Sequence, residues 1–290
     1  MHVDFAILDP ETVVRRAFEM PALPQSTVRL ASIIANENVE LIDVVQVIEC
    51  DPALTLKLLR VANSVYSSSS RSIGTVKDAV IRLGTGAVLG LAIGSCVQPA
   101  IVRVLPGYNI SGSDFWRHSL ATALSTECLR AYTRVRVSPL AFTTALLHDI
   151  GKLVLGNFLN AEVCEYLENA TRNGKLSAFE AESEILSMHH GEVGGVIAQH
   201  WGLPEAVVKG ITFHHTPELC EESIGYLVHL SNYVAHRVSP VPHFGNEELP
   251  DVAPIDISND LKELGLMSES IAMISTAVRD RLAAVSAEFE

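Results

Sequence analysis

Apolar residues recur at spacings of three and four along most of this 290-residue chain. In the segment that opens at Asp51 and Pro52, the positions Leu54, Leu58 and Val61 share one face of a helix. An acid followed by proline is a typical helix start, because the acid caps free backbone N–H groups and proline needs no partner in the first turn. No segment shows the sustained two-residue alternation of a half-buried strand. The sequence therefore predicts an all-α protein.

Turn-forming residues cluster at 105–113 and divide the predicted helices into two halves. We expect 1–110 to form short helices joined by tight turns, with Gly84 as one helix stop. The half at 111–237 is expected to hold longer helices at about 114–132, 139–150, 152–173, 177–187, 190–201, 204–215 and 223–237. The remainder, 238–290, starts with a proline-rich segment expected to be a loop as far as Pro254. A last amphipathic helix is predicted over Met267–Phe289, for packing or a partner contact.

The charge balance argues against a nucleic-acid partner. With 21 basic and 34 acidic residues, the net charge of -13 repels a phosphate backbone. A helix-turn-helix reading of the first half fails as well, since Thr75–Gly84 offers only Lys77 and Arg82. A local basic pocket for a nucleotide ligand stays open, because net charge is an average over the chain.

The cysteines and the apolar runs indicate a cytoplasmic protein. The chain has five cysteines, far apart and without a Cys-x-x-Cys pair, so we expect free thiols and neither disulfides nor a thiol-ligated zinc. The N-terminus lacks the pattern of a signal peptide. The longest uncharged run, Leu83–Val102, is broken by glycines and Pro99 and suits a buried helix better than a bilayer span. We expect no membrane insertion.

Several polar side chains continue apolar stripes of the predicted helices. In the helix expected at 139–150, the stripe that contains Phe142 and Ala145 leads to His148 and Asp149. A buried carboxylate needs a partner or a cation. The same helical spacing, applied to the other predicted helices, places further polar side chains on inward faces. They are His118, His190, His214, His215 and Asn232.

These residue types are ligands of divalent transition metals. A metal held by imidazole and carboxylate groups could activate water for attack on a phosphoester. A single buried histidine is more often a core residue bonded to backbone, but a set spread over five helices favours a metal site. The other histidines of the half at 111–237 do not continue an apolar helix face and are expected to be structural. They are His189, His200, His229 and His236.

The segment Leu146–Lys152, with sequence LLHDIGK, resembles the HD superfamily of metal-dependent phosphohydrolases. The motifs WRHS at 116–119, HGEVG at 190–194 and FHH at 213–215 resemble, in this order, elements of the HD-GYP cyclic-di-GMP phosphodiesterases and their HDOD relatives. The order is more specific than the His-Asp dyad alone.

Upstream motifs resemble the N-terminal helical half that is peculiar to HDOD proteins. They are MPALP at 20–24, DPAL at 51–54, LLRVANS at 58–64 and AVIRLG at 79–84. The whole resemblance covers about residues 13–237. It implies an HD-type helical bundle preceded by an HDOD-type helical subdomain, and an output role in bacterial signal transduction.

Carried over residue by residue, the resemblance implies metal ligands at His118, His148, Asp149, His190, His214 and His215, and a phosphate contact at Lys152. Asn232 stands where the pattern has its closing aspartate. An amide is a poorer metal ligand than a carboxylate. The Gly-Tyr-Pro segment is also absent, since 216–219 reads TPEL. Hydrolysis of cyclic-di-GMP is therefore not expected.

Two hypotheses of function remain, and the first is favoured. In the first, the chain is a non-catalytic signalling module that binds a protein partner or a nucleotide second messenger. In the second, it is a metal-dependent phosphohydrolase for a phosphoester or cyclic nucleotide, with Asp149 and Lys152 in catalytic roles. One or two divalent metals, iron, manganese or zinc, are expected in the second hypothesis. The first is compatible with a structural metal or with none.

Overall fold

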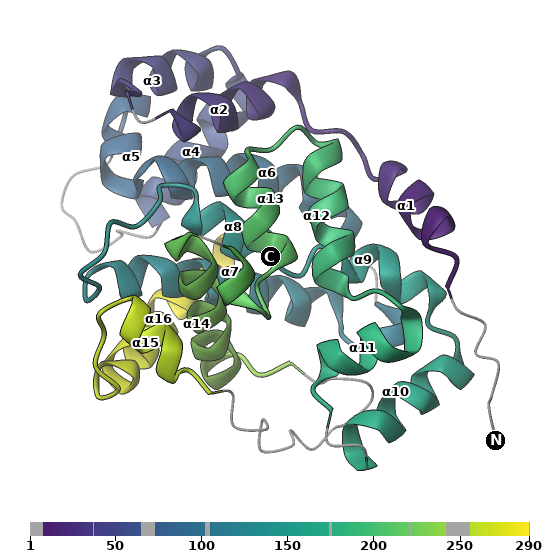
Figure 1. Ribbon diagram of the computed structural model, residues 1–290. Helices are drawn as coiled ribbons and strands as arrows, with labels where there is room; N and C mark the ends of the chain where they lie inside the picture. Colours follow the sequence, from purple (N-terminus) through teal and green to yellow (C-terminus); the bar gives the residue numbers. More distant parts are fainter. Residues whose placement is uncertain are drawn as a thin grey trace.

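In the computed structural model, residues 8–36, 38–64, 73–101, 105–173, 176–220, 222–241 and 256–289 are described. All regular elements within these ranges are helical, and the one β-bridge found there pairs Leu105 with Ile110. The all-α prediction is confirmed for this part of the chain (Figure 1).

The first half contains α1 (Pro10–Phe18), α2 (Gln25–Ala35), α3 (Leu41–Glu49), α4 (Pro52–Ser64), α5 (Val76–Leu83) and α6 (Thr85–Ile101). Helices α2 to α5 lie together at one end of the molecule, next to α6 (Figure 1). Helices α3, α4 and α5 pack against one another, and α2 packs on α3 and α6. Helix α1 lies apart from this group and contacts α12 and α9.

The helix stop predicted at Gly84 is confirmed. Gly84 has a φ of 80°, in the left-handed region that favours glycine, and α5 ends at the residue before it. Among the described helices, none is by itself long and apolar enough to cross a membrane. Helices α5 and α6 meet that criterion only as a pair, and they are bent by 106° at their junction.

The second half is built around the long helices α7 and α14, which pack against each other. Its elements are η1 (Pro106–Tyr108), α7 (Gly112–Arg130), α8 (Ala141–Leu147), α9 (Lys152–Leu155), η2 (Gly156–Phe158), α10 (Ala161–Asn173), α11 (Ala178–Leu186), α12 (His190–His200), α13 (Glu205–Thr212), η3 (Pro217–Cys220) and α14 (Ser223–Val238). Helix α8 lies between α6, α7, α13 and α14 and is buried at every residue. The end of α8 therefore lies in the centre of the bundle.

The prediction of one continuous helix over 152–173 is wrong. Helix α9 ends at Leu155, the short turn η2 follows, and α10 begins at Ala161. The Asn157 amide donates to the carbonyl of Leu153, and the Asn160 side chain accepts from the backbone N–H of Val163. An asparagine that accepts in this way starts a new helix. The apolar periodicity of the sequence therefore runs on from α9 into α10, although the helix itself is interrupted between them.

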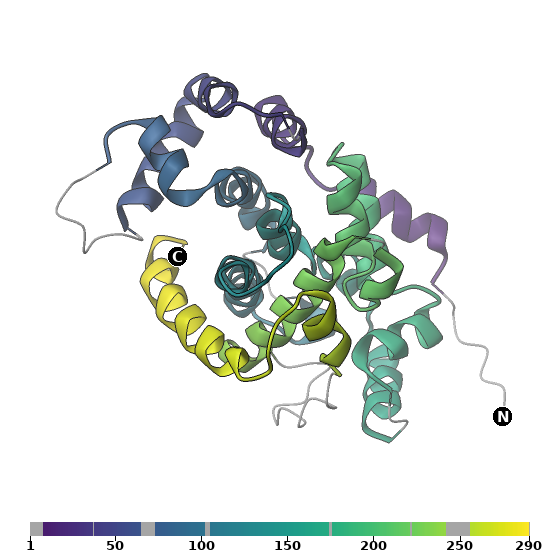
Figure 2. The ribbon, with the colours of Figure 1, turned by 60° about the vertical axis from the view of Figure 1, so that its left-hand side comes forward.

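Two C-terminal helices complete the fold, α15 (Ser258–Glu263) and α16 (Ser270–Phe289). Helix α16 packs along α7 and α14 and also contacts α4 (Figure 2). It begins at Ser270, three residues later than predicted. Of the proline-rich segment expected to be a loop, residues 242–254 lie outside the described part of the chain.

Candidate metal centre

The residues singled out in the sequence meet in the middle of the second half. His118 comes from α7, His148 and Asp149 from the end of α8, and Asn232 from α14. His190 is the first residue of α12, and His214 and His215 follow the end of α13. Seven of these side chains keep 5% or less of their surface exposed: His118, His148, Asp149, Lys152, His190, His214 and Asn232. His215 is half-buried.

Glycines allow the helix ends that carry these residues to approach closely. A Cβ on Gly151 would lie 2.0 Å from the backbone oxygen of His190. A Cβ on Gly195 would lie 2.0 Å from the hydroxyl of Thr212. Real atoms do not approach so closely, so these contacts of α12 with the start of α9 and with α13 require glycine. The glycines thereby bring His190 next to Asp149 and His214.

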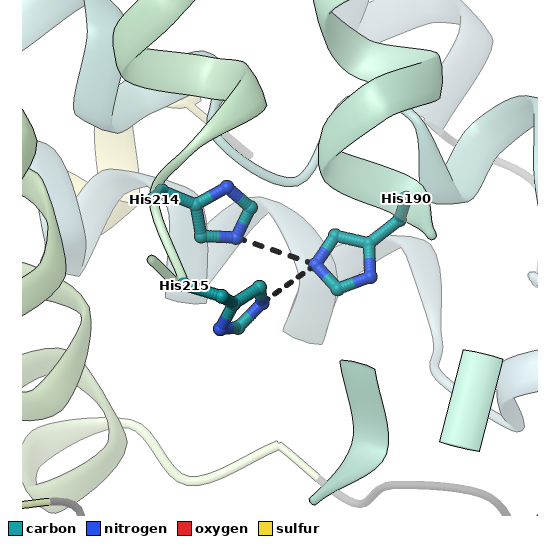
Figure 3. A group of neighbouring side chains, drawn as sticks. All are labelled: His190, His214 and His215. Atoms are coloured by element: carbon teal, nitrogen blue, oxygen red, sulfur yellow. Dashed lines mark hydrogen bonds between the residues drawn. The ribbon is translucent and has the colours of Figure 1, made fainter. Parts of the chain in front are cut away.

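Three imidazoles face one another in what we call the His190 cluster (His190, His214 and His215; Figure 3). The Nε2 atom of His190 lies 3.3 Å from Nε2 of His214 and 2.9 Å from Nε2 of His215. His215 is also stacked on the ring of Phe179, with 4.8 Å between the centroids and 3° between the planes. The three nitrogens converge from two different helix ends.

Hydrogen bonds on the other ring nitrogen fix which atoms face the cluster. Nδ1 of His214 lies 2.7 Å from the carbonyl of Ile211, and Nδ1 of His190 lies 2.7 Å from a carboxylate oxygen of Glu182. Because both oxygens only accept, each Nδ1 carries the hydrogen and each Nε2 is left with its lone pair. The lone pairs of His190 and His214 that face each other at 3.3 Å repel, so a cation between them, either a proton or a metal ion, would stabilise this arrangement.

Asp149 joins this cluster to a second one, the His118 cluster (His118, His148 and Asp149). Its Oδ1 lies 3.2 Å from Nε2 of His190 and 3.9 Å from Nε2 of His214. Its Oδ2 lies 3.4 Å from Nε2 of His148 and 4.0 Å from Nε2 of His118. One carboxylate thus faces both groups of imidazoles.

The His118 cluster has contacts that compete with a metal. Lys152 donates from Nζ to Oδ2 of Asp149 at 2.7 Å. Oδ1 of Asn232 lies 3.0 Å from Nε2 of His118, so this nitrogen holds a hydrogen and donates it to the amide oxygen. Two of the three possible ligand atoms of this cluster are therefore already engaged.

Burial and neighbouring charges shift the pKa values of the pocket residues in both directions. Burial raises the pKa of Asp149, but His148 and Lys152 hold it well below its ordinary value. Burial lowers the pKa of His190, but the carboxylate of Glu182 raises it above its ordinary value. Burial and neighbouring imidazoles hold the pKa values of His214 and His215 well below theirs. The carboxylate of Glu182 thus favours positive charge on His190, whereas His214 and His215 favour the neutral form.

The pocket also contains residues that the sequence analysis missed. Glu182 on α11 is fully buried and contacts His190, and the Tyr108 hydroxyl donates to it at 3.0 Å. Glu182 shares a helix face with Phe179 and Leu186, a signal that could have identified it. His236, expected to be structural, lies against His118, with 4.5 Å between the ring centroids and 44° between the ring planes.

The other three histidines read as structural lie outside the two clusters. His189 accepts the backbone N–H of Gly191 as the cap of α12. His229 pairs with the buried Asp260 of α15 at 2.9 Å, and the ring of His200 lies against Phe18. These contacts hold helix ends and neighbouring elements together.

The residues present fit a divalent metal. Nε2 of His148 is buried without a hydrogen-bond partner in the described structure, and Oδ1 of Asp149 has Nε2 of His190 as its near neighbour at 3.2 Å. Buried polar atoms normally have a partner, so the unpartnered Nε2 of His148, 3.4 Å from Oδ2 of Asp149, indicates a place for a cation. Imidazole nitrogen and carboxylate oxygen are the donor set of zinc, iron and manganese sites. Both clusters can therefore supply metal ligands.

Comparison with known proteins identifies the family and the fold. The sequence model for the HDOD domain matches residues 20–217. A crystal structure of a candidate phosphohydrolase from Shewanella amazonensis SB2B has 24% identity, a TM-score of 0.66 and coverage of 99% of both chains. A candidate signal transduction protein from Marinobacter aquaeolei VT8 has 22% identity and a TM-score of 0.70 over 97% of this chain and 64% of its own. Likeness at these identities shows the fold alone.

A curated relative is an uncharacterized protein from Treponema pallidum (strain Nichols). It is 26% identical over 214 residues, which make up 73% of this chain and 40% of that protein. The chain therefore spans less than half the length of this relative.

Proposed function

The chain belongs to the HDOD domain family, and on that premise we propose that it is a signal-transduction output module that holds one divalent metal and catalyses no reaction. The metal would lie in the His190 cluster, with Asp149 as a further ligand. Its role would be to fix the ends of α8, α12 and α13 relative to one another.

The observation that carries this proposal is the difference between the two clusters. In the His190 cluster the Nε2 atoms converge, and for His190 and His214 the opposite ring nitrogen, Nδ1, already donates to an acceptor. In the His118 cluster, Asn232 engages His118 and Lys152 engages Asp149. Two-metal hydrolysis needs both positions filled at short separation. The His190 cluster can thus hold one metal ion, whereas protein contacts occupy the ligands of the His118 cluster. This difference supports a pocket that binds a metal without catalysing a reaction.

The burial of most of the proposed ligands supports the same proposal. His190, His214 and Asp149 are 3% exposed or less, and His215 is half-buried. A substrate has to reach the reacting groups, whereas a structural metal site is closed. Zinc or iron suits the nitrogen-rich donor set, and manganese is the third candidate.

The signal would reach this module through a protein partner or a nucleotide second messenger in the cytoplasm. The net charge of -13 supports a partner other than nucleic acid. The five separated cysteines, all free thiols in the structure, support a reducing compartment.

The test uses the purified chain loaded in turn with iron, manganese and zinc. We expect no turnover of cyclic dinucleotides or simple phosphoesters with any of them. Removal of the metal by a chelator should lower the melting temperature, because a ligand that binds only the folded state stabilises it. Metal-dependent turnover that is lost in Asp149→Asn would overturn the proposal.

That outcome would favour the second candidate, a metal-dependent phosphohydrolase. One observation favours it: the His118 cluster still lies beside the His190 cluster and shares Asp149 with it. In that function Lys152 would have to leave Asp149 and contact a phosphate group. A Lys152→Met variant would then lose turnover while it keeps its metal.

A further inference from the structure

Glu182 is a buried carboxylate whose two oxygens have different partners. It is 0% exposed. Its Oε2 accepts the backbone N–H of His190 at 2.8 Å and the ring Nδ1–H of the same residue at 2.7 Å. Its Oε1 accepts the hydroxyl of Tyr108 at 3.0 Å. A buried carboxylate is costly unless donors compensate it, and here three donors do so.

This arrangement distinguishes His190 from the neighbouring histidines. Nδ1 of His148 donates to the carbonyl of Ala145, and Nδ1 of His214 donates to the carbonyl of Ile211. Both acceptors are neutral carbonyls three residues earlier in the chain. Nδ1 of His190 instead donates to a carboxylate eight residues away, on another helix. A carboxylate partner fixes the ring and makes the opposite nitrogen a stronger donor to a metal than a carbonyl partner does.

Tyr108 holds the carboxylate in its orientation. The side chain is 0% exposed, and Nζ of Lys152 lies 5.8 Å from its ring centroid. A Cβ on the preceding Gly107 would lie 2.1 Å from Cβ of Leu159, so the segment is tightly packed. This segment was expected to be the break between the two halves. With Oε1 held by Tyr108, Oε2 of Glu182 faces His190.

We propose that Glu182, oriented by Tyr108, is a positioning residue that determines how tightly His190 holds the metal. The inference rests on the proposed metal-holding function and adds a partner outside the predicted ligands. It also means that the segment at 105–113, through Tyr108, contacts a residue that borders the metal site. Neither Glu182 nor Tyr108 would touch the metal.

The experiment measures Co²⁺ binding to the full chain by competition with a chelator and by visible absorption. We expect Glu182→Gln to weaken Co²⁺ binding by about 10- to 100-fold, the usual effect of losing a partner behind a metal ligand. We expect Tyr108→Phe to weaken it by about fivefold, the equivalent of one ordinary hydrogen bond. The Co²⁺ absorption bands should also change in Glu182→Gln, because the ring of His190 is no longer held by a charge.

Two matched controls separate this role from general destabilisation. Glu184→Gln makes the same chemical change at an exposed position of α11. Tyr132→Phe removes a hydroxyl from a side chain that is 41% exposed. Both should bind Co²⁺ as the wild type does. Tyr108→Phe keeps the test valid if Glu182→Gln fails to fold.

The outcomes are distinguishable. If the wild type binds no Co²⁺, the proposed function and this inference both fail. If the wild type binds Co²⁺ and Glu182→Gln binds it with the same affinity and spectrum, this inference is overturned and the proposed function stands. An unchanged affinity in Tyr108→Phe would overturn the role of the tyrosine.

Discussion

Replacing Asn232 by aspartate should convert the His118 cluster into a metal site. Oδ1 of Asn232 lies 3.0 Å from Nε2 of His118, which lies 4.0 Å from Oδ2 of Asp149. The new carboxylate would thus stand within ~7 Å of the Asp149 carboxylate, where two like charges at an effective dielectric of ~20 repel by about 2 kcal/mol. The metal-free Asn232→Asp variant should be less stable by about this amount.

A divalent cation between the two carboxylates removes this repulsion. The gain of about 2 kcal/mol corresponds to about 30-fold tighter metal binding, since 1.4 kcal/mol is a factor of ten. The assay is a competition titration with Zn²⁺ or Mn²⁺ at pH 8, where protons compete less for the imidazoles. Metal content should rise from one to two ions per chain.

Asn160→Asp is the matched control, because it adds the same charge at an exposed helix cap where either side chain is suitable. It should leave both metal affinity and stability unchanged. Equal affinity of Asn232→Asp and the wild type would refute the account of the His118 cluster as a site closed by an amide.

Three further predictions concern the same pocket. Asp149→Asn should destabilise the protein by about 3–5 kcal/mol in chemical unfolding, because it leaves the buried Lys152 ammonium uncompensated, and a second change, Lys152→Met, should restore much of the loss. Gly151→Ala should unfold at lower denaturant than the wild type, because its Cβ would meet the backbone oxygen of His190 at 2.0 Å; equal stability would show that this contact relaxes freely. The metal-free protein should lose stability as the pH falls below about 6.5. The folded state keeps His148, His214 and His215 neutral, with pKa values lowered first by burial, while the unfolded chain takes up the protons. The raised pKa of His190 acts in the opposite direction, but it is one group against five described histidines with lowered pKa values, since those of His189 and His236 are lowered as well. Melting temperatures that rise on acidification would therefore contradict the charge assignment.

Helical periodicity was enough to identify most of the pocket. His148 and Asp149 continue the buried stripe of α8, and His190 and His214 stand at the ends of amphipathic helices. Side chains in these positions point inward because of the helix repeat alone. The direction of a side chain is thus predictable from its own helix.

Contacts between helices were not predictable in this way. The hydrogen bonds that Glu182 makes with His190 and Tyr108 depend on where α11 and η1 lie relative to the start of α12, which no local pattern encodes. Periodicity also ran across the break after Leu155, because a cap at Asn160 restarts the helix in nearly the same apolar pattern. The contact of His236 with the pocket was not predicted, because the ring against which it lies, that of His118, belongs to a different helix.

The central claim is that the chain holds one metal in the His190 cluster. The most direct measurement is the number of metal ions per chain, determined by elemental analysis after loading with zinc, iron or manganese and exhaustive dialysis. The account predicts one tightly bound ion in the wild type and none in His214→Ala, whose imidazole faces Nε2 of His190 at 3.3 Å. Two ions per chain, or none, would contradict it.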